Sequence, residues 1–172
     1  IYIIMIKSKR IYLRRFTMDE AELLFQLDGD ANVMKYITLG IPRTMDEIID
    51  KSIPRILKSY QDKLDFGIFA AYLIKSDKYI GWFQFERDKE FEDAIEIGWR
   101  LKKQYWGNGY ATEVATVLCE LGIKIGKTIV ARAMIENLAS IRVMEKAGLK
   151  FEKEFWGDYD PHSGSPDVLY KR

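Results

Sequence analysis

Hydrophobic and polar positions follow two periods along this chain, one typical of β-strands and the other of α-helices. Runs rich in β-branched and aromatic residues predict strands at 11–16, 66–74, 79–87, 94–101, 128–134, 149–156 and 168–171. Apolar residues at helical spacing predict one helix that begins after Gly109 and another at 138–147, which Gly148 closes. The order of these elements predicts a mixed-sheet α/β (α+β) fold, and no linker or repeat interrupts it. We therefore expect a single domain over residues 1–172.

The sequence Thr-Met-Asp-Glu occurs twice, at 17–20 and at 44–47. Its spacing is that of a capping box, in which the threonine side chain accepts a hydrogen bond from the new helix and the glutamate reaches back to the threonine N–H. Two helices are therefore expected to begin near residues 18 and 45, with a loop at 28–43 between them. The polar turn at 75–78 is expected to join two strands in a hairpin.

The composition is ordinary for a soluble globular protein, with 48% hydrophobic and 31% charged residues. Lys and Arg number 27 against 26 Asp and Glu, a net charge of +1, so the chain lacks the basic excess of nucleic-acid-binding proteins. Cys119 is the single cysteine and cannot form an internal disulfide, which favours a reducing compartment and a cytoplasmic protein. We expect no nucleic-acid partner, and a homodimer is left open.

The first residues are apolar, but Lys7, Lys9 and Arg10 end the run well short of a membrane span or a signal-peptide core. We expect no membrane partner, and residues 1–4 are interpreted as an upstream extension without a function of their own.

The most informative segment lies between a predicted strand and a predicted helix, and reads Gln104-Tyr-Trp-Gly-Asn-Gly-Tyr-Ala-Thr-Glu113. Gly107 and Gly109 allow a tight turn that brings backbone N–H groups close to a ligand, and the following helix adds the positive end of its dipole. The segment therefore predicts an anion site, although a Gly-x-Gly turn alone is a weak signal.

Two nucleotide-binding motifs do not fit this segment. A P-loop carries Lys and Ser or Thr after its last glycine, where this chain has Tyr110 and Ala111. A dinucleotide fingerprint carries a third glycine, where this chain has Thr112, and it follows the first strand of its domain. A simple turn before a helix remains the alternative.

Together with its neighbours, the segment resembles the GNAT superfamily of acyl-CoA-dependent N-acetyltransferases over roughly residues 8 to 170. The resemblance is strongest to the RimJ/RimL-like branch of ribosomal-protein N-terminal acetyltransferases, and it rests on four motifs, at 11–14, 96–99, 105–113 and 137–140. It implies a central twisted, mostly antiparallel mixed sheet of about seven strands flanked by about four helices. It also implies acetyl-CoA as the donor and a primary amine as the acceptor.

The resemblance also assigns donor contacts. The pyrophosphate of coenzyme A is expected on the amides of the loop, formed by Trp106, Gly107, Asn108, Gly109, Tyr110, Ala111 and Thr112. Trp106 stands where the superfamily usually has Arg or Gln. The loss of that side chain leaves the contacts of the loop's backbone amides to the pyrophosphate intact. The backbone N–H groups of Trp99, Arg100 and Leu101 are the family's usual contacts to the pantetheine arm and the thioester carbonyl. The side chain of Trp99 itself is more typical of a core or pocket wall.

Glu96 is the acidic residue of the strand at 94–101, and alternation directs it away from the face of Ile95 and Ile97. One interpretation is a catalytic base that takes the proton of the amine directly or through water, as the resemblance implies. The other is a structural carboxylate that pairs with Lys or Arg or faces solvent.

Asn137 and Ser140 have the spacing of an N-cap and the third residue of a helix. The resemblance implies that Asn137 also contacts the pantetheine arm and that Ser140 protonates the departing thiolate. Many members carry Tyr four residues after this serine, where this chain has Met144. A water relay and direct departure of the stabilised thiolate therefore remain alternatives.

Other residues are interpreted as structural. Cys119 is expected to be a buried small hydrophobe, and His162 to lie in a surface loop that could border the acceptor pocket. Trp82, Phe83 and Phe85 are expected to fill the core on alternate positions, and no residues have metal-ligand spacing. The resemblance implies that the chain is an N-acetyltransferase, and the branch that it resembles implies peptide α-amines as the acceptors. The alternatives are an acetyltransferase of an antibiotic, a polyamine or another small amine, and a module that binds acyl-CoA without turnover.

Overall fold

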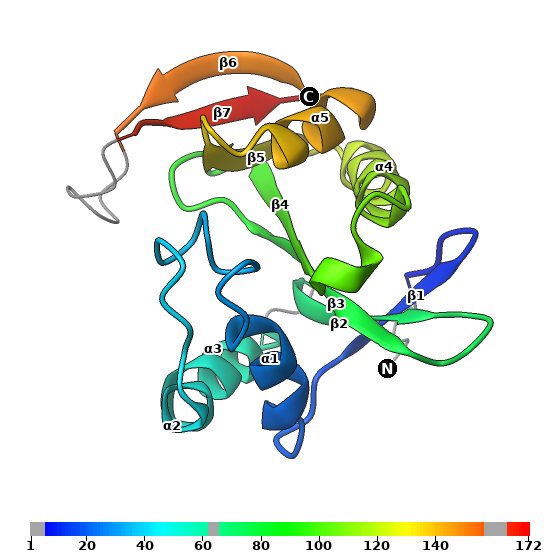
Figure 1. Cartoon of the computed structure of the whole chain (residues 1–172). Helices are drawn as coiled ribbons and strands as arrows, with labels where there is room; N and C mark the ends of the chain where they lie inside the picture. Colours follow the sequence, from blue (N-terminus) through cyan, green and yellow to red (C-terminus); the bar gives the residue numbers. More distant parts are fainter. Residues whose placement is uncertain (1–5, 62–65, 157–164) are drawn as a thin grey trace.

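A seven-stranded sheet forms the centre of the structure, with the strand order β1-β2-β3-β4-β5-β7-β6 (Figure 1). The computed structural model describes residues 6–61, 66–156 and 165–172. The strands are β1 (Ile11–Arg15), β2 (Gly67–Leu73), β3 (Tyr79–Arg87), β4 (Ala94–Leu101), β5 (Thr128–Met134), β6 (Lys150–Phe155) and β7 (Asp167–Lys171). Only β4 and β5 pair in parallel, and the other neighbours in the sheet are antiparallel. The predicted mixed, mostly antiparallel sheet is therefore confirmed.

Helices cover both faces of this sheet. They are α1 (Ala21–Asp28), α2 (Met45–Glu47), the π-turn η1 (Ile48–Ser52), α3 (Ile53–Ser59), the 3₁₀ turn η2 (Lys103–Tyr105), α4 (Tyr110–Lys124) and α5 (Leu138–Lys146). One hydrophobic cluster joins α4 and α5 to the sheet, and a second joins α1, η1 and α3 to the opposite face. Strand β2 contributes to both, because Phe69 packs in the first cluster and its neighbours Ile68 and Ala70 pack in the second.

The parallel pair β4–β5 positions the site. Parallel neighbours need a long crossover, and α4 provides it. The two strands pair only at their beginnings, where residues 94–96 lie beside residues 128–130. Beyond Glu96, β4 continues beside β3 while β5 continues beside β7. A gap therefore opens within the sheet between the second halves of β4 and β5.

The first predicted capping box does not start a helix at residue 18. Helix α1 begins at Ala21, and Glu20 forms only half of the box, since its carboxylate accepts the N–H of Thr17 at 2.9 Å. The same carboxylate is bound by the guanidinium of Arg14 in β1, with Nη1 at 2.9 Å. The other half of the box is missing because the N–H of Glu20 donates to the backbone carbonyl of Thr17 at 3.3 Å, as in a turn, and the helix starts one residue later.

The second capping box is confirmed. The N–H of Glu47 donates to Thr44 Oγ1 at 3.2 Å, and the N–H of Thr44 donates to Glu47 Oε2 at 2.9 Å. The helical path then widens into η1 before it continues as α3. Pro54, at the start of α3, has no N–H to donate, which favours a break of the regular α-helical ladder at this point.

The remaining predicted elements are found close to their expected bounds. The hairpin of β2 and β3 is present, and α5 is followed by Gly148 with a φ of +88°. Among the helices of the described residues, none is both long and apolar enough to cross a membrane.

Candidate active site

The glycine loop adopts the tight conformation that its sequence predicts. Gly107 and Gly109 have φ values of +75° and +77°, in the left-handed region that favours glycine. Gly109 is the N-cap of α4 and has no side chain to cap the helix, so the first N–H groups of α4 stay open to a ligand. A side-chain carbon on Gly107 would meet no atom within 4 Å, so the loop has free space beside it. These features fit an anion such as a diphosphate.

Side chains within the loop fix its shape. The indole N–H of Trp106 donates to the carbonyl of Leu101 at 2.7 Å, which ties the loop to the end of β4. The side-chain amide of Asn108 donates to the carbonyls of Tyr105 and Trp106 at 3.2 and 3.0 Å. Both residues thus support the loop through contacts inside it, while its outer amides remain exposed.

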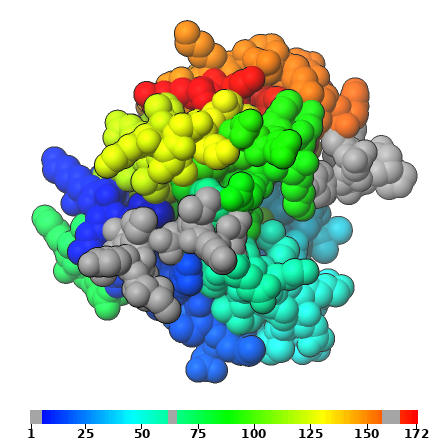
Figure 2. Space-filling model, turned by 180° about the vertical axis from the view of Figure 1, so that it is seen from behind, coloured from blue at the N-terminus to red at the C-terminus, as the bar shows by residue number. Residues whose placement is uncertain are grey.

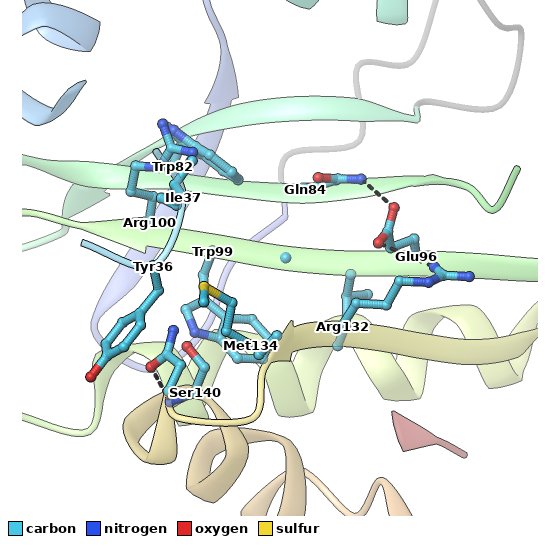
Figure 3. Close-up of a pocket in the computed structure, with 14 residues that line it drawn as sticks. Tyr36, Ile37, Trp82, Gln84, Glu96, Trp99, Arg100, Arg132, Met134 and Ser140 are labelled. Atoms are coloured by element: carbon cyan, nitrogen blue, oxygen red, sulfur yellow. Dashed lines mark hydrogen bonds and ion pairs between the residues drawn. The ribbon is translucent and has the colours of Figure 1, made fainter. Parts of the chain in front are cut away.

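A pocket of about 200 Å³ lies next to the gap between β4 and β5 (Figure 3). It brings together five of the predicted site residues, namely Glu96, Trp99, Arg100, Asn137 and Ser140. The other lining residues come from the loop after α1, from β3, from β4 and from β5, and they are Tyr36, Ile37, Trp82, Gln84, Ile97, Gly98, Arg132, Ala133 and Met134. Leu101, the last residue of β4, and the loop residues 106–112 that follow it do not line this pocket.

The pocket passes from one face of the sheet toward the other. Glu96 and Arg100 leave β4 on one face, whereas Ile97 and Trp99 leave it on the opposite face, yet all four line the pocket. This is geometrically consistent because β5 has separated from β4 at this point. In Figure 3, Glu96 and Trp99 accordingly lie on opposite sides of the β4 ribbon.

Strand pairing determines which backbone amides of β4 face the gap. The N–H of Lys102 donates to Ile80 in β3, and the carbonyl of Ala94 accepts from Asp88 at the other end of the same ladder. Alternation then directs the N–H of Arg100 toward β3 and the N–H groups of Trp99 and Leu101 toward the gap. Two of the three amides expected at the thioester thus remain on the open side, and Arg100 contributes its side chain to the pocket instead.

Arg100 is not a solvated residue. Its side chain is only 13% exposed, its guanidinium donates to the buried carboxylate of Asp28, and it lies 4.9 Å from the centre of the Trp82 ring. Burial lowers the pKa of Arg100, and Asp28 opposes that change. The pair connects β4 to the end of α1, and Arg100 lines one end of the pocket.

Glu96 lies at the other end of the pocket, where both of its oxygens are bound. Oε1 is 3.2 Å from Nη1 of Arg132, and Oε2 accepts the side-chain amide of Gln84 at 3.1 Å (Figure 3). The side chain is 28% exposed. The structure therefore shows the ion pair that the sequence left as an alternative, at a carboxylate that also faces the pocket.

Arg132 is shared between several carboxylates. Besides Glu96 it binds the buried Asp88 through both terminal nitrogens, and Nη2 lies 3.1 Å from Glu90 Oε2. Burial alone would lower the pKa of Arg132, but the carboxylates of Asp88, Glu96 and Glu90 outweigh that effect and raise it. Arg132 therefore carries a fixed positive charge beside Glu96.

The start of α5 forms the wall of the pocket opposite β4. Asn137 is the N-cap, because its side-chain oxygen accepts the N–H of Ser140 at 3.2 Å. This confirms the structural interpretation of Asn137, whose side chain also borders the pocket. Met144 of α5, at the position where the resemblance leads one to expect a tyrosine, is buried in the first hydrophobic cluster, so this position offers no hydroxyl group.

Several site residues were not predicted from the sequence. Arg132 and Gln84 reach the pocket because of the register of β3, β4 and β5, and sequence spacing does not carry that information. Gly98 shares the face of Glu96 and Arg100, and alternation along β4 could have indicated its place. Trp82, interpreted as a core residue, packs in the core and also lines the pocket. Cys119 is buried as expected, and burial raises the pKa of its thiol to about 11. His162 lies outside the described residues.

Comparison with known proteins adds independent evidence. The family model of the acetyltransferase (GNAT) domain matches residues 10–150. The uncharacterized N-acetyltransferase YnaD of Bacillus subtilis (strain 168) is 32% identical over 167 residues, which cover 90% of this chain and 93% of the relative. A crystal structure of a GNAT-family acetyltransferase from Bacillus anthracis is 28% identical, superposes with a TM-score of 0.81 and covers 98% of each chain.

A structure of RimL, a ribosomal-protein alpha-N-acetyltransferase in complex with coenzyme A, is more distant. It is 17% identical, with a TM-score of 0.78, and the match covers 96% of this chain and 94% of RimL. A similarity of this size shows the shared fold alone. The predicted RimJ/RimL-like branch therefore stays a prediction.

Proposed function

The chain belongs to the GNAT family of acetyltransferases, and we propose that it transfers the acetyl group of acetyl-CoA to the α-amine of a peptide or protein N-terminus. The observation that carries this proposal is the gap between β4 and β5, which has the glycine loop at the end of β4 and the pocket of Glu96 beside it. Donor and acceptor would meet in that gap, so that the amine attacks the thioester directly in a ternary complex.

The donor would be held by backbone groups. In the proposed arrangement the amides of Gly107, Asn108 and Gly109 and the first turn of α4 bind the pyrophosphate. The amides of Trp99 and Leu101 bind the thioester carbonyl and stabilise the negative charge that develops on its oxygen. Asn137, at the opposite wall, contacts the pantetheine arm.

The proton transfers would involve Glu96 and Ser140. In the proposed reaction the amine loses a proton to Glu96, directly or through water, as its nitrogen bonds to the acetyl carbon. The carbon–sulfur bond breaks, and the thiolate takes a proton from the hydroxyl of Ser140 or from a water beside it. The proton held by Glu96 then returns through water to the group that protonated the thiolate, which restores both side chains. Acetylated amine and free coenzyme A are the products.

A small amine is the alternative acceptor. The pocket of about 200 Å³ is compatible with it, since a cavity of this size holds a small molecule as well as the first residue of a peptide. A panel of peptides with different first residues, assayed beside diamines, polyamines and aminoglycosides, separates the two classes. If the protein acetylates small amines and none of the peptides, the acceptor is a small amine and the proposed peptide α-amine is wrong.

A non-catalytic acyl-CoA module is the alternative of a different class. It is favoured by the ion pair that already binds both oxygens of Glu96 and by the buried Met144. We expect the variant Glu96→Gln to bind acetyl-CoA as the wild type does and to lose about 10²-fold in kcat. Thiol release from acetyl-CoA measures this loss, and a wild type that binds acetyl-CoA but releases no thiol with any amine would establish the non-catalytic module.

A further inference from the structure

A cation from the beginning of the chain lies beside the glycine loop. The segment before β1 packs against α4, and Figure 2 shows the blue N-terminal part of the chain against the yellow-green surface of that helix. Arg10 is in this segment, one residue before β1. Its Nη2 donates to the carbonyl of Asn108 at 3.1 Å, and its guanidinium carbon lies 4.4 Å from the centre of the Tyr110 ring. It therefore touches the loop on either side of Gly109.

Glu113, in the first turn of α4, fixes this arginine. Its Oε2 is 2.6 Å from Nε of Arg10, and its Oε1 accepts the backbone N–H of Arg10 and the hydroxyl of Ser8, both at 2.7 Å. Burial would raise the pKa of Glu113, but the hydrogen bonds from Ser8 and Arg10 outweigh it and lower the pKa. Glu113 is therefore ionised at neutral pH and directed toward the strand.

This arrangement solves an electrostatic problem of the proposed donor site. A carboxylate in the first turn of α4 repels any second anion that binds to the same helix end. The guanidinium of Arg10 neutralises the negative charge of Glu113 through their ion pair. Its own side chain is 42% exposed, and its Nη1 has no hydrogen-bond partner among the described residues. One donor of the guanidinium thus stays available to a phosphate.

We propose that Arg10 is a binding residue of the donor site: held by Glu113 and by the carbonyl of Asn108, it binds a phosphate group of coenzyme A beside the glycine loop. This inference rests on the proposed function, because it takes the loop as the coenzyme A site. The phosphate is either the diphosphate or the 3′-phosphate of the ribose, which share the same chemistry.

The test is calorimetric titration of the whole protein with coenzyme A and with 3′-dephospho-coenzyme A. Arg10→Met removes the positive charge, and we expect it to weaken coenzyme A binding about tenfold. A charge-assisted hydrogen bond to the phosphate is lost, and the negative charge of Glu113 is no longer neutralised. Arg10→Lys should recover much of the loss. Lys9→Met removes an equal charge from the neighbouring exposed residue and should change the affinity less than about twofold.

The two ligands identify the phosphate. A loss for coenzyme A but not for its 3′-dephospho form would place Arg10 on the 3′-phosphate, and an equal loss for both would place it on the diphosphate. The double variant with Arg10→Met and Glu113→Gln should bind better than Arg10→Met alone, since the exposed carboxylate is gone.

The proposal is overturned if Arg10→Met, folded as judged by an unchanged thermal midpoint, binds coenzyme A as the wild type does. It is also overturned if Lys9→Met weakens binding equally, because the effect would then be one of general charge. A wild type that binds neither ligand would contradict the proposed function itself, a result distinct from both.

Discussion

At the scale of single residues, the position and charge of the Glu96 carboxylate depend on contacts with neighbouring strands. Its position on β4 follows from the sequence, but its electrostatic environment comes from β3 and β5. Arg132 is a charged neighbour of Glu96. The buried Asp88 fixes its guanidinium by an ion pair, and Nη1 also lies 3.2 Å from Oε1 of Glu96. Asp88 is fixed in turn, since its Oδ1 accepts the N–H groups of Glu90 and Phe91 at 2.9 and 2.8 Å.

Arg132→Lys tests this positioning. Lysine keeps the charge that Asp88 requires but lacks the planar fork that reaches two carboxylates at once. We expect kcat/KM to fall about tenfold while acetyl-CoA affinity stays constant, and we expect almost no further loss in a Glu96→Gln background. A double-mutant cycle of thiol-release kinetics measures the coupling. Additive losses would show that Arg132 does not act through Glu96.

Gly98 is the second residue whose role depends on its neighbours. It lies on β4 between Glu96 and Arg100 and faces Gln84 across the ladder, so the missing side chain leaves room in the pocket. A methyl group there would come within 3.3 Å of Gln84 Oε1, at the end of a flexible side chain. Gly98→Ala should therefore fold and raise the KM for the amine several-fold, as steady-state kinetics with varied acceptor would show.

At the scale of elements, the end of β4 is held in place by β3. Gly81 has a φ of +146° next to a bulge in the β2–β3 pair, and it lies opposite Leu101. A methyl group on Gly81 would come within 2.1 Å of the backbone oxygen of Arg100. Backbone cannot move aside as a side chain can, so this glycine sets how closely β3 approaches the backbone of β4 at Arg100 and Leu101.

Gly81→Ala should consequently destabilise the protein by about 2–4 kcal/mol, because either β4 shifts or the φ changes. Urea unfolding measures the loss of unfolding free energy in this variant and in Gly98→Ala. The two variants are comparable because each adds one methyl group to the β3–β4 pair. Equal losses of unfolding free energy in the two variants would contradict the rigid contact between the backbones of β3 and β4.

The elements themselves were largely predictable, and the reasons differ from one element to another. Strands β2 to β5 follow from their apolar runs, and α5 follows from Asn137 and Gly148. The predicted start of α1 was wrong because the N–H of Glu20 donates to the backbone carbonyl of Thr17 instead of to its hydroxyl, while Arg14 of β1 binds the glutamate carboxylate. Spacing along the chain shows neither contact.

The site was predictable only in part, for a related reason. Glu96, Trp99 and Ser140 belong to motifs that are continuous in sequence, whereas Arg132 and Gln84 reach the pocket, and Arg10 reaches the glycine loop, through strand register and packing. Spacing along the chain does not encode those contacts. The glycine loop was recognisable because Gly107 and Gly109 meet a backbone requirement that is local.

At the scale of the whole molecule, buried carboxylates link stability to pH. Burial would raise the pKa of Asp88, but hydrogen bonds from Arg132 and from the N–H groups of Phe91 and Glu90 outweigh it and lower the pKa. Hydrogen bonds from Arg14 and Thr17 likewise outweigh burial at Glu20 and lower its pKa. A carboxylate with a lowered pKa stabilises the fold above its unfolded pKa, and this stabilisation is lost as pH falls through the folded value.

We therefore expect the unfolding free energy to fall as pH decreases below about 4, where the unfolded carboxylates take up protons. Asp88→Asn should lower the unfolding free energy at pH 7 by about 3 kcal/mol, since Arg132 loses its buried partner. The same variant should lose less than the wild type between pH 7 and pH 3. Denaturant unfolding at both pH values measures this, and an equal acid loss in both proteins would contradict the role of Asp88.

The central claim is that the glycine loop holds acetyl-CoA, and calorimetric titration with acetyl-CoA tests it most directly. Gly107→Trp would fill the open side of the loop, while Gly126→Trp is a matched control at the other end of α4. The two glycines have φ values of +75° and +76°, and a side-chain carbon on either would meet no atom within 4 Å. We predict binding to the wild type and to Gly126→Trp, and none to Gly107→Trp. Binding of acetyl-CoA to all three proteins would show that the donor site is not at the glycine loop. Absence of binding to the wild type would contradict the proposed acetyltransferase function.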